Sequence, residues 1–124
     1  MEQRHLPHDH GRQAEHILEH LPAAREFQLV SDLFKQLSDA TRVRIFWILC
    51  HCEECVINLS AMMEMSSPAV SHHLRQLKSA ELLVSRREGK EVYYKAAENE
   101  SARALHDMIE TLLAMTCPNE HEEE

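Results

Sequence analysis

The sequence predicts a mainly α-helical domain with one small β-hairpin, and two observations carry this prediction. Apolar residues recur three or four positions apart through most of residues 23–77, which is the spacing of one face of a helix. Further along, two β-prone runs, Leu83–Arg87 and Glu91–Lys95, flank a turn that contains Gly89, which is typical of a hairpin. A chain of 124 residues with 44% apolar content suffices for one domain with a core of ordinary size.

Composition divides the chain into three parts. Residues 1–22 are polar, include Pro7 and Gly11, and hold five of the ten histidines, so we expect a flexible, histidine-rich N-terminal arm. Residues 23–116 carry the helical and hairpin patterns and are expected to form the folded domain. Residues 117–124 end in a run of acids, which predicts a solvated acidic tail.

The first two helices are predicted from residues 23–37 and from the stretch after Asp39. The apolar face of the first is formed by Phe27, Val30, Phe34 and Leu37. Asp39 is a suitable N-cap for the second, whose body, Val43–Cys50, is apolar on almost every side. Such a helix must be buried on most sides, so we expect it, including Trp47, to form the centre of the core.

Residues 56–77 have the pattern of two short helices joined by a tight turn. Their apolar faces are supplied by Val56, Leu59, Met62 and Met63 in the first helix and by Val70, Leu74 and Leu77 in the second. Ser67 is the expected N-cap of the second helix, because Pro68 follows it and proline is well tolerated at the first helical position. Helix, turn, helix and hairpin in this order predict a winged helix-turn-helix domain.

The polar face of the second of these helices is rich in groups that hydrogen-bond base edges and phosphates. The residues expected to contact DNA are Ser66, Ser67, Ser71, His72, His73, Arg75 and Gln76 from the helix, and Arg86, Arg87 and Lys90 from the hairpin. Taken alone, the helix pair is equally explained as a helical hairpin with a solvated face. The chain has a net charge of −8, but residues 68–95 hold six cations against three carboxylates. This local excess of positive charge favours binding to double-stranded DNA through one basic patch.

The segment with the highest density of thiol and imidazole groups in the chain is Cys50-His51-Cys52-Glu53-Glu54-Cys55. Thiolates at this spacing favour thiophilic metal ions, namely Zn(II), Cd(II), Pb(II), Cu(I) or As(III). We expect Cys52 and Cys55 to be ligands, whereas Cys50 is either a third ligand or a small buried residue of the preceding helix. Further donors are required for a complete site, and His8 and His10 of the arm are the candidates.

The cysteines also bear on where the protein works. The sequence has no apolar run long enough to span a membrane and no apolar signal-peptide core, so we expect a cytoplasmic protein. In a reducing compartment, four cysteines favour metal ligands, redox sensors or core residues over structural disulfides. A reversible disulfide therefore stays open as an alternative signal to a metal ion.

Four stretches in combination resemble the ArsR/SmtB family of metal-sensing repressors, and the resemblance covers about residues 34–95. These stretches are Ser38–Ile45, Cys55–Leu59, Ser67–Leu74 and Arg87–Tyr94. The resemblance implies a homodimeric winged-helix repressor that binds a palindromic operator when metal-free and leaves it on binding metal. It also implies a dimer interface built from the first and last helices, which agrees with an apolar stripe of Leu105, Met108, Ile109 and Leu112.

The family's two usual sensing sites carry over only in part. Cys55 matches the first cysteine of the family motif E-L-C-V-C-D-L, but Ile57 stands where the second would be, and Cys50 and Cys52 are additions that could compensate. At the last helix, Glu98 and Glu100 loosely match the first pair of ligands of the other site. The positions of the second pair are occupied by Thr111 and Ala114, which cannot bind metal.

Two weaker donor pairs lie near the C-terminus. His106 and Glu110 are one helical turn apart, and Cys117 and His121 form a possible accessory pair. Three functions from different classes remain: a metal-responsive repressor, a redox-responsive repressor, and a metal-buffering protein without an operator. The last leaves the wing arginines and the capped polar helix unexplained. An enzyme is not expected, because no nucleophile comes with a base and an orienting partner.

Overall fold

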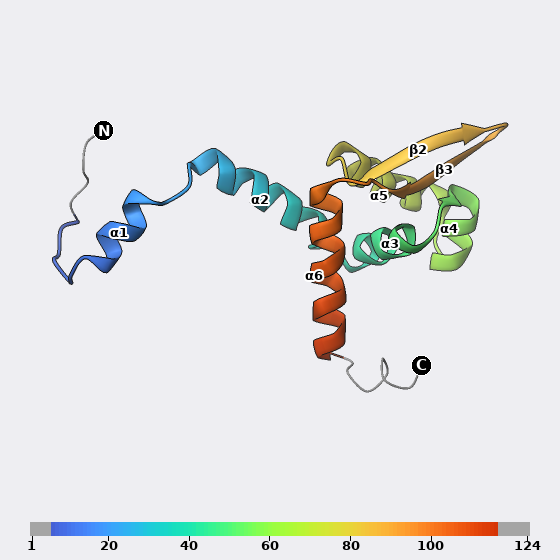
Figure 1. The fold of residues 1–124 in the computed structure, drawn as a ribbon. Helices are drawn as coiled ribbons and strands as arrows, with labels where there is room; N and C mark the ends of the chain where they lie inside the picture. The colour runs from blue at the N-terminus through green and yellow to red at the C-terminus, as the bar shows by residue number, and fades with distance from the viewer. Residues whose placement is uncertain (1–5, 117–124) are drawn as a thin grey trace. The chain divides into compact units, whose positions relative to one another are not determined.

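The computed structural model describes residues 6–116, which fall into two compact units that divide between Ser31 and Asp32. The first unit contains helix α1 (Gln13–Glu19) and the start of helix α2 (Ala24–Gln36), which continues into the second unit (Figure 1). Neither helix has a buried residue. Helix α1 lies within the range for which the sequence predicts a flexible arm, and the division of the chain falls nine residues beyond the predicted boundary at residue 22.

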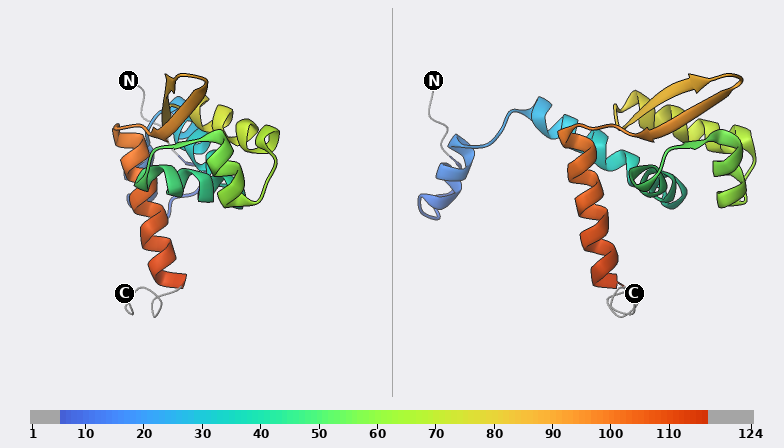
Figure 2. Two further views of the ribbon diagram at one scale, coloured as in Figure 1. Left: turned by 90° about the vertical axis from the view of Figure 1, so that its right-hand side faces the viewer. Right: turned by 45° about the vertical axis from the view of Figure 1, so that its right-hand side comes forward.

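The second unit is a winged helix-turn-helix domain, so the predicted fold class is confirmed. Its elements are α3 (Ala40–His51), β1 (Glu54–Cys55), α4 (Val56–Met63), α5 (Ser67–Ser79), β2 (Leu83–Glu88), β3 (Glu91–Ala96) and α6 (Glu100–Thr116). The strands form an antiparallel sheet in the order β1-β3-β2. Figure 2 shows that the tip of the β2–β3 hairpin and the C-terminal end of α6 point to different sides of this unit.

The core lies where α3, α4, α5 and α6 meet the sheet. Its fully buried large side chains are Ile45, Phe46, Leu49, Leu59, Val70, Leu74, Leu77 and Leu82. Three of these come from α3, as the nearly all-apolar sequence of that helix predicts. Strand β1 was not predicted. It pairs Glu54 with Tyr94 and Cys55 with Tyr93, and so attaches the cysteine-rich segment to the wing.

A buried arginine organises the junction between α2 and α3. Asp39 caps α3 by accepting a hydrogen bond from the backbone N–H of Arg42 at 2.9 Å, as predicted, and this bond lowers the pKa of the Asp39 carboxyl. The Arg42 guanidinium itself is buried. Its Nε and Nη2 donate to the carbonyl oxygens of Gln36 and Lys35 at 2.8 and 2.9 Å, which satisfies the C-terminal end of α2.

The turn between α4 and α5 is closed by a residue in a left-handed conformation. Glu64 has φ 54°, a value that is usual for glycine at the end of a helix, and the sequence has no glycine here. Helix α5 begins at Ser67, one residue before the predicted start at Pro68, because Ser66 is the N-cap and accepts from Ala69 N–H at 3.3 Å. Proline still occupies the first turn, where its missing N–H leaves no bond unmade.

Helix α6 has one buried and one exposed apolar face. Leu105 and Ile109 are 3% and 6% exposed and belong to the core of the unit. The expectation that they form an unburied stripe together with Met108 and Leu112 is therefore wrong for these two residues. The exposed apolar side chains of α6 are Met108, Leu112, Leu113 and Met115. Within residues 6–116, no helix combines the length and the apolar character that crossing a membrane requires.

Candidate functional site

Helix α5 presents the polar face that the sequence predicts, with the core side held by Val70, Leu74 and Leu77. Ser66, Ser67, His72 and Arg75 are exposed, and Ser71 and Gln76 are half-buried. His72 and Gln76 are one helical turn apart, and the imidazole of His72 contacts the amide of Gln76 with a distance of 3.1 Å between their Nε2 atoms. Ser67 also bonds to Ser60 of α4 through their hydroxyl groups at 3.1 Å, which fixes the two helices of the motif to each other.

His73 lies at the inner edge of this face. It is half-buried, and its Nδ1 is 3.5 Å from Nη1 of the buried Arg42. Burial lowers the pKa of His73, because desolvation disfavours the charged imidazolium. The structure thus places His73 against the α2–α3 junction, whereas its neighbour His72 is exposed.

The wing carries two adjacent arginines in different situations. Arg86 makes a bidentate ion pair with Glu53, with Nε and Nη2 at 3.0 and 2.7 Å from Oε1, and a second ion pair with Glu88 at 2.6 Å. Its guanidinium also stacks over the ring of Tyr93, 4.7 Å from the centroid. Its pKa is raised by these carboxylates. Arg86 therefore ties the wing to the segment before β1.

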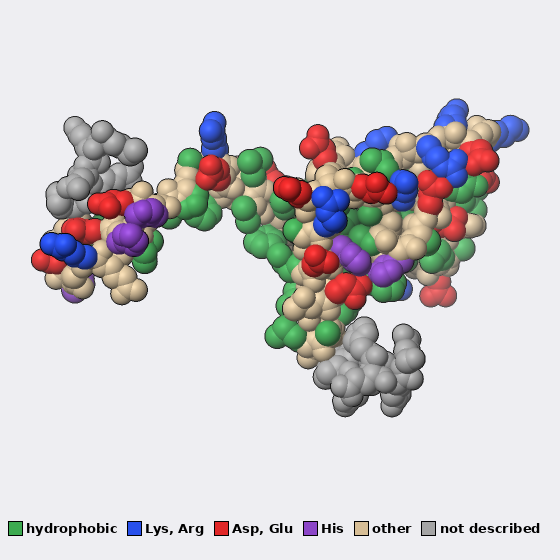
Figure 3. Space-filling view, viewed as in Figure 1, with side chains coloured by type: hydrophobic (Ala, Val, Ile, Leu, Met, Phe, Trp, Pro, Cys, Tyr) green, Lys and Arg blue, Asp and Glu red, His purple; other side chains and the backbone are tan. Residues whose placement is uncertain are grey.

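Arg87 and Lys90 are exposed like Arg86, but neither forms an ion pair with any residue in the 6–116 range. They lie at the end of β2 and in the turn to β3. Figure 3 shows Lys and Arg side chains gathered along this hairpin and at its tip. Lys78, at the end of α5, donates to Ser85 Oγ of β2 at 2.6 Å and links the recognition helix to the wing.

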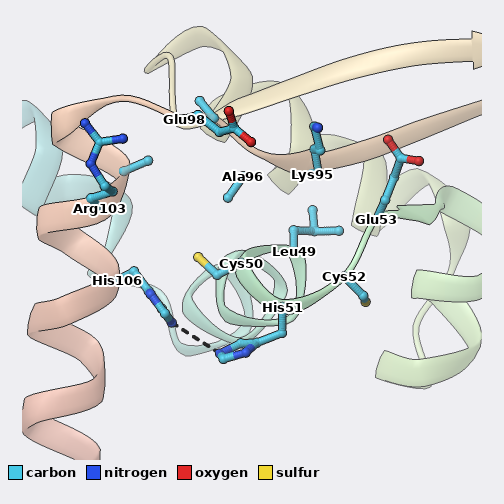
Figure 4. A pocket seen from close by; sticks show the side chains of 12 residues that line it. Leu49, Cys50, His51, Cys52, Glu53, Lys95, Ala96, Glu98, Arg103 and His106 are labelled. Atoms are coloured by element: carbon cyan, nitrogen blue, oxygen red, sulfur yellow. Dashed lines mark hydrogen bonds between the residues drawn. The ribbon is translucent and has the colours of Figure 1, made fainter.

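The three described cysteines do not converge. Cys55 is buried in strand β1, Cys52 is exposed and its thiol donates to the Ile48 carbonyl at 3.5 Å, and Cys50 is half-buried near the end of α3. Burial and the Glu110 carboxylate raise the pKa of the Cys50 thiol to about 11, so this thiol is protonated at neutral pH. In Figure 4 the sulfur atoms of Cys50 and Cys52 point to different sides of the α3 end.

A cluster of other donors forms instead between the end of α3 and the middle of α6. His51 Nε2 and His106 Nε2 are 3.2 Å apart, and they lie 3.3 and 3.2 Å from Glu110 Oε1. Figure 4 shows the two imidazoles facing each other from the two helices. The cluster borders a cleft of about 350 Å³, whose lining includes His51, His106, Cys50 and Cys52.

Trp47 holds the carboxylate of this cluster. Its indole N–H donates to Glu110 Oε1 at 2.7 Å, and its ring lies 4.2 Å from that of His51, one turn further along α3. This indole bond is the largest cause of a lowered Glu110 pKa, with smaller contributions from His51 and His106. Glu110 is therefore ionised at neutral pH. The sequence predicted Trp47 only as a core residue.

A second group of donors lies on α1, in the first unit. His16, Glu19 and His20 place their ligand atoms close together at an exposed position, and His20 Nδ1 also lies 2.8 Å from the His16 carbonyl oxygen. The predicted ligands His8 and His10 stack with their ring centroids 5.8 Å apart. Of the described residues, only these two groups of three, on α1 and between α3 and α6, bring potential metal ligands together, and neither includes a cysteine. The predicted set of Cys50, Cys52, Cys55, His8 and His10 stays a prediction, and Cys117 and His121 lie outside the described residues.

Residues 39–85 match the model of the bacterial regulatory protein family called arsR. A transcriptional repressor SmtB homolog from Synechocystis is 33% identical over 103 residues, which are 83% of this chain and 78% of that protein. The chain belongs to the ArsR family. The resemblance inferred from the sequence is thereby confirmed, and so is the expectation of a transcriptional regulator rather than an enzyme.

Another relative and two solved structures are also similar to this chain. The regulator KmtR of Mycobacterium tuberculosis is 40% identical over 77 residues, which are 62% of this chain and 58% of that protein. A homodimeric winged helix-turn-helix DNA-binding domain from Mycobacterium bovis superimposes with a TM-score of 0.65 at 28% identity, covering 73% of this chain and 82% of that one. HlyU from Vibrio cholerae does so with a TM-score of 0.67 at 26% identity, covering 73% and 97%.

Proposed function

We propose that this protein is a metal-responsive transcriptional repressor that binds operator DNA as a homodimer when metal-free and is released by a metal ion. The observation that carries the DNA-binding part is the surface of α5 and the wing. Side chains able to bond to bases, such as His72 and Gln76, lie on α5. The exposed cations Arg87 and Lys90 lie on the wing beside it, where a winged helix meets the phosphate backbone.

Two observations support a homodimer. Met108, Leu112, Leu113 and Met115 leave an exposed apolar face on α6 that the core of the unit does not use. The Mycobacterium bovis domain of the same fold is described as homodimeric. A two-fold dimer would present two copies of α5 to successive major grooves, about 34 Å apart, and would favour a palindromic operator.

Metal response is supported by the names of the relatives and by donor groups in this chain. The relatives include a cadmium resistance regulatory protein of Staphylococcus aureus and the arsenical resistance operon repressor of Escherichia coli. They are 46% and 40% identical over 66 and 70 residues, which are just over half of this chain in each case. The expectation of thiophilic ligands at Cys52 and Cys55 remains a proposal, because Cys52 is exposed whereas Cys55 is held in strand β1. We place the protein in the cytoplasm, where a repressor meets its operator.

A mobility-shift titration on the DNA upstream of the chain's own coding sequence tests the proposal. The full-length protein is titrated onto this DNA and onto a shuffled control, first with a chelator and then with Zn(II), Cd(II), Pb(II), Cu(I) or As(III). We expect tight binding to the upstream DNA without metal, release by at least one ion, and recovery on adding chelator. Allosteric coupling in such systems is typically about 1–3 kcal/mol, which corresponds to a loss of roughly 5- to 150-fold in affinity.

The same titration under strictly anaerobic conditions separates the two signals that the sequence left open. Release by metal without oxygen supports the metal-responsive repressor. Release by an oxidant alone, with no response to any of the five ions, would replace it with the redox-responsive alternative. Equal affinity for upstream and shuffled DNA would reject the repressor itself.

A further inference from the structure

We propose that His51, His106 and Glu110 form a binding site for a borderline divalent cation of the Zn(II), Co(II) or Ni(II) class within one protomer. The site joins the C-terminal end of α3 to α6 and lies wholly in the second unit. Its position as a metal site stands on geometry alone. Its role as a switch rests on the proposed function.

The spacing of the three donor atoms is that of a metal polyhedron. Zinc binds imidazole nitrogen and carboxylate oxygen at about 2.0–2.2 Å in a tetrahedral arrangement, and the edge of such a tetrahedron is about 3.3 Å. The three separations among His51 Nε2, His106 Nε2 and Glu110 Oε1 are 3.2, 3.2 and 3.3 Å. An ion at the centre would reach all three atoms with very small movements of the side chains.

Hydrogen bonds alone satisfy this arrangement poorly. Glu110 Oε1 accepts the indole N–H of Trp47 at 2.7 Å, and a carboxylate oxygen has two lone-pair positions. Both imidazole nitrogens then compete for the one position left on Oε1, while they also lie 3.2 Å from each other. A cation removes the conflict because each imidazole directs a lone pair to it and Oε1 keeps one lone pair for Trp47 and one for the metal.

Trp47 acts as a positioning residue for the site. Metal-binding carboxylates are commonly held by a hydrogen bond from a neighbouring group, which fixes their orientation. Here the indole N–H aims Oε1 at the two imidazoles, and the Trp47 ring packs on His51 at 4.2 Å between centroids. The residue that appears in the sequence as core packing thus orders two of the three donors.

The donor set selects the class of ion. Two imidazoles and a carboxylate suit Zn(II), Co(II) and Ni(II), whereas Cu(I) and As(III) require soft sulfur ligands. The His51 side chain is 46% exposed and the cluster borders an open cleft, so an ion can enter and the fourth coordination position is accessible to water. A cation here would fasten α6, which bears the exposed apolar face, to the helix that leads through β1 into the helix-turn-helix.

The test measures metal binding and DNA binding separately on the full-length protein in the presence of a reductant. Co(II) is titrated first, because its visible spectrum reports tetrahedral coordination, and Zn(II) is then used to displace it. The variants are His51→Ala, His106→Gln and Glu110→Gln, with Trp47→Phe for the positioning residue. The matched control is the double variant His16→Gln, His20→Gln, which removes the other described cluster of donors.

We expect one tetrahedral Co(II) per protomer in the wild type and in the control. Loss of a direct ligand should weaken Zn(II) affinity by more than about 100-fold, because even loss of an outer-shell partner costs about 10- to 100-fold. Trp47→Phe keeps an aromatic ring but removes the indole N–H, and it should lower affinity within that smaller range and shift the Co(II) spectrum. Circular dichroism of the metal-free variants confirms that they are folded, and His51 is exposed enough for its replacement to be tolerated.

Each alternative outcome has a defined meaning. Unchanged Co(II) spectra in His51→Ala and His106→Gln would overturn the site. Loss of the spectrum in the α1 control, or in the two additional single variants Cys52→Ser and Cys55→Ser but not in the histidine variants, would overturn it as well. If the site binds metal as described but none of the five ions changes operator affinity in the wild type, the site stands and the proposed function fails. If Zn(II) releases DNA equally from the wild type and from His106→Gln, the proposed function stands and the role of this site as the switch is overturned.

Discussion

The two functional halves of the second unit present their side chains in different ways. On α5 and the wing, the groups proposed to meet DNA are close in sequence, largely exposed and mostly without ion-pair partners among the described residues. Between α3 and α6, the donor groups come from positions more than 50 residues apart and already contact one another. A surface that must adapt to an external polyanion keeps its charges available, whereas a site for a small ion must be preorganised.

The largest contrast should appear on the two faces of α6. Ile109→Ala opens a cavity in the core and should destabilise the protein by about 2–5 kcal/mol, whereas Leu112→Ala removes an exposed group and should cost much less in the isolated protomer. Chemical denaturation of both variants measures this difference. If the exposed face is the dimer interface, only Leu112→Ala should weaken association in sedimentation experiments without a large loss of protomer stability.

Zn(II) should stabilise the folded protein by binding between α3 and α6. A ligand that binds only the folded state adds about 2.7 kcal/mol of stability at a free concentration 100 times its dissociation constant. We therefore expect Zn(II) to raise the melting temperature of the wild type and of the His16→Gln, His20→Gln control, but not that of Glu110→Gln. An equal increase in all three proteins would show that Zn(II) stabilises the chain elsewhere.

Sequence preference should reside on α5. If Gln76 contacts a base edge, Gln76→Ala should lose about 1–3 kcal/mol of discrimination at one operator position while nonspecific affinity changes little. Binding to a set of single-base operator variants measures this. Affinity that falls by the same factor on every sequence would instead assign Gln76 to the phosphate backbone.

The neighbouring wing arginines provide a matched pair. Arg87→Ala and Lys90→Ala should each reduce the dependence of log affinity on log salt by about 0.9 unit per lost phosphate contact, or about 1.8 units for a homodimer that loses one contact in each protomer. Arg86 is already engaged by Glu53 and Glu88, so Arg86→Ala should change this slope less and act mainly on the position of the wing. Equal slopes for Arg86→Ala and Arg87→Ala would remove the distinction between them.

The smallest effect is expected in the turn between α4 and α5. Glu64 adopts φ 54°, and glycine avoids the steric cost that a side chain meets there. Glu64→Gly should therefore raise stability slightly, by up to about 1 kcal/mol, less the entropy that glycine gains in the unfolded state. Thermal melting measures the change, and a clear loss of stability would mean that the Glu64 side chain has a stabilising role of its own.

The helices and the hairpin of the winged helix, and their order, could be predicted from the sequence, whereas strand β1 could not. Local patterns are enough for this, because helical spacing, a capping residue such as Asp39 and a glycine turn each act over a few residues. The same patterns placed α5 and the wing beside each other, since hairpin and helix are adjacent in the chain. The candidate DNA surface could therefore be predicted nearly in full, apart from the inward position of His73 and the ion pairs of Arg86.

The side chains that converge across the fold could be identified only from the packing of the helices. His106 and Glu110 were visible as a helical pair, but their convergence with His51 depends on how α6 packs against α3, and no local pattern encodes that packing. Packing also accounts for the burial of Ile109, for the hydrogen bond from Arg42 to the end of α2 and for the hydrogen bond from Trp47 to Glu110. The cysteine-rich segment shows the opposite case. Its cysteines are close together in the sequence and therefore suggested one site, but a helix end followed by a strand directs neighbouring side chains to different sides.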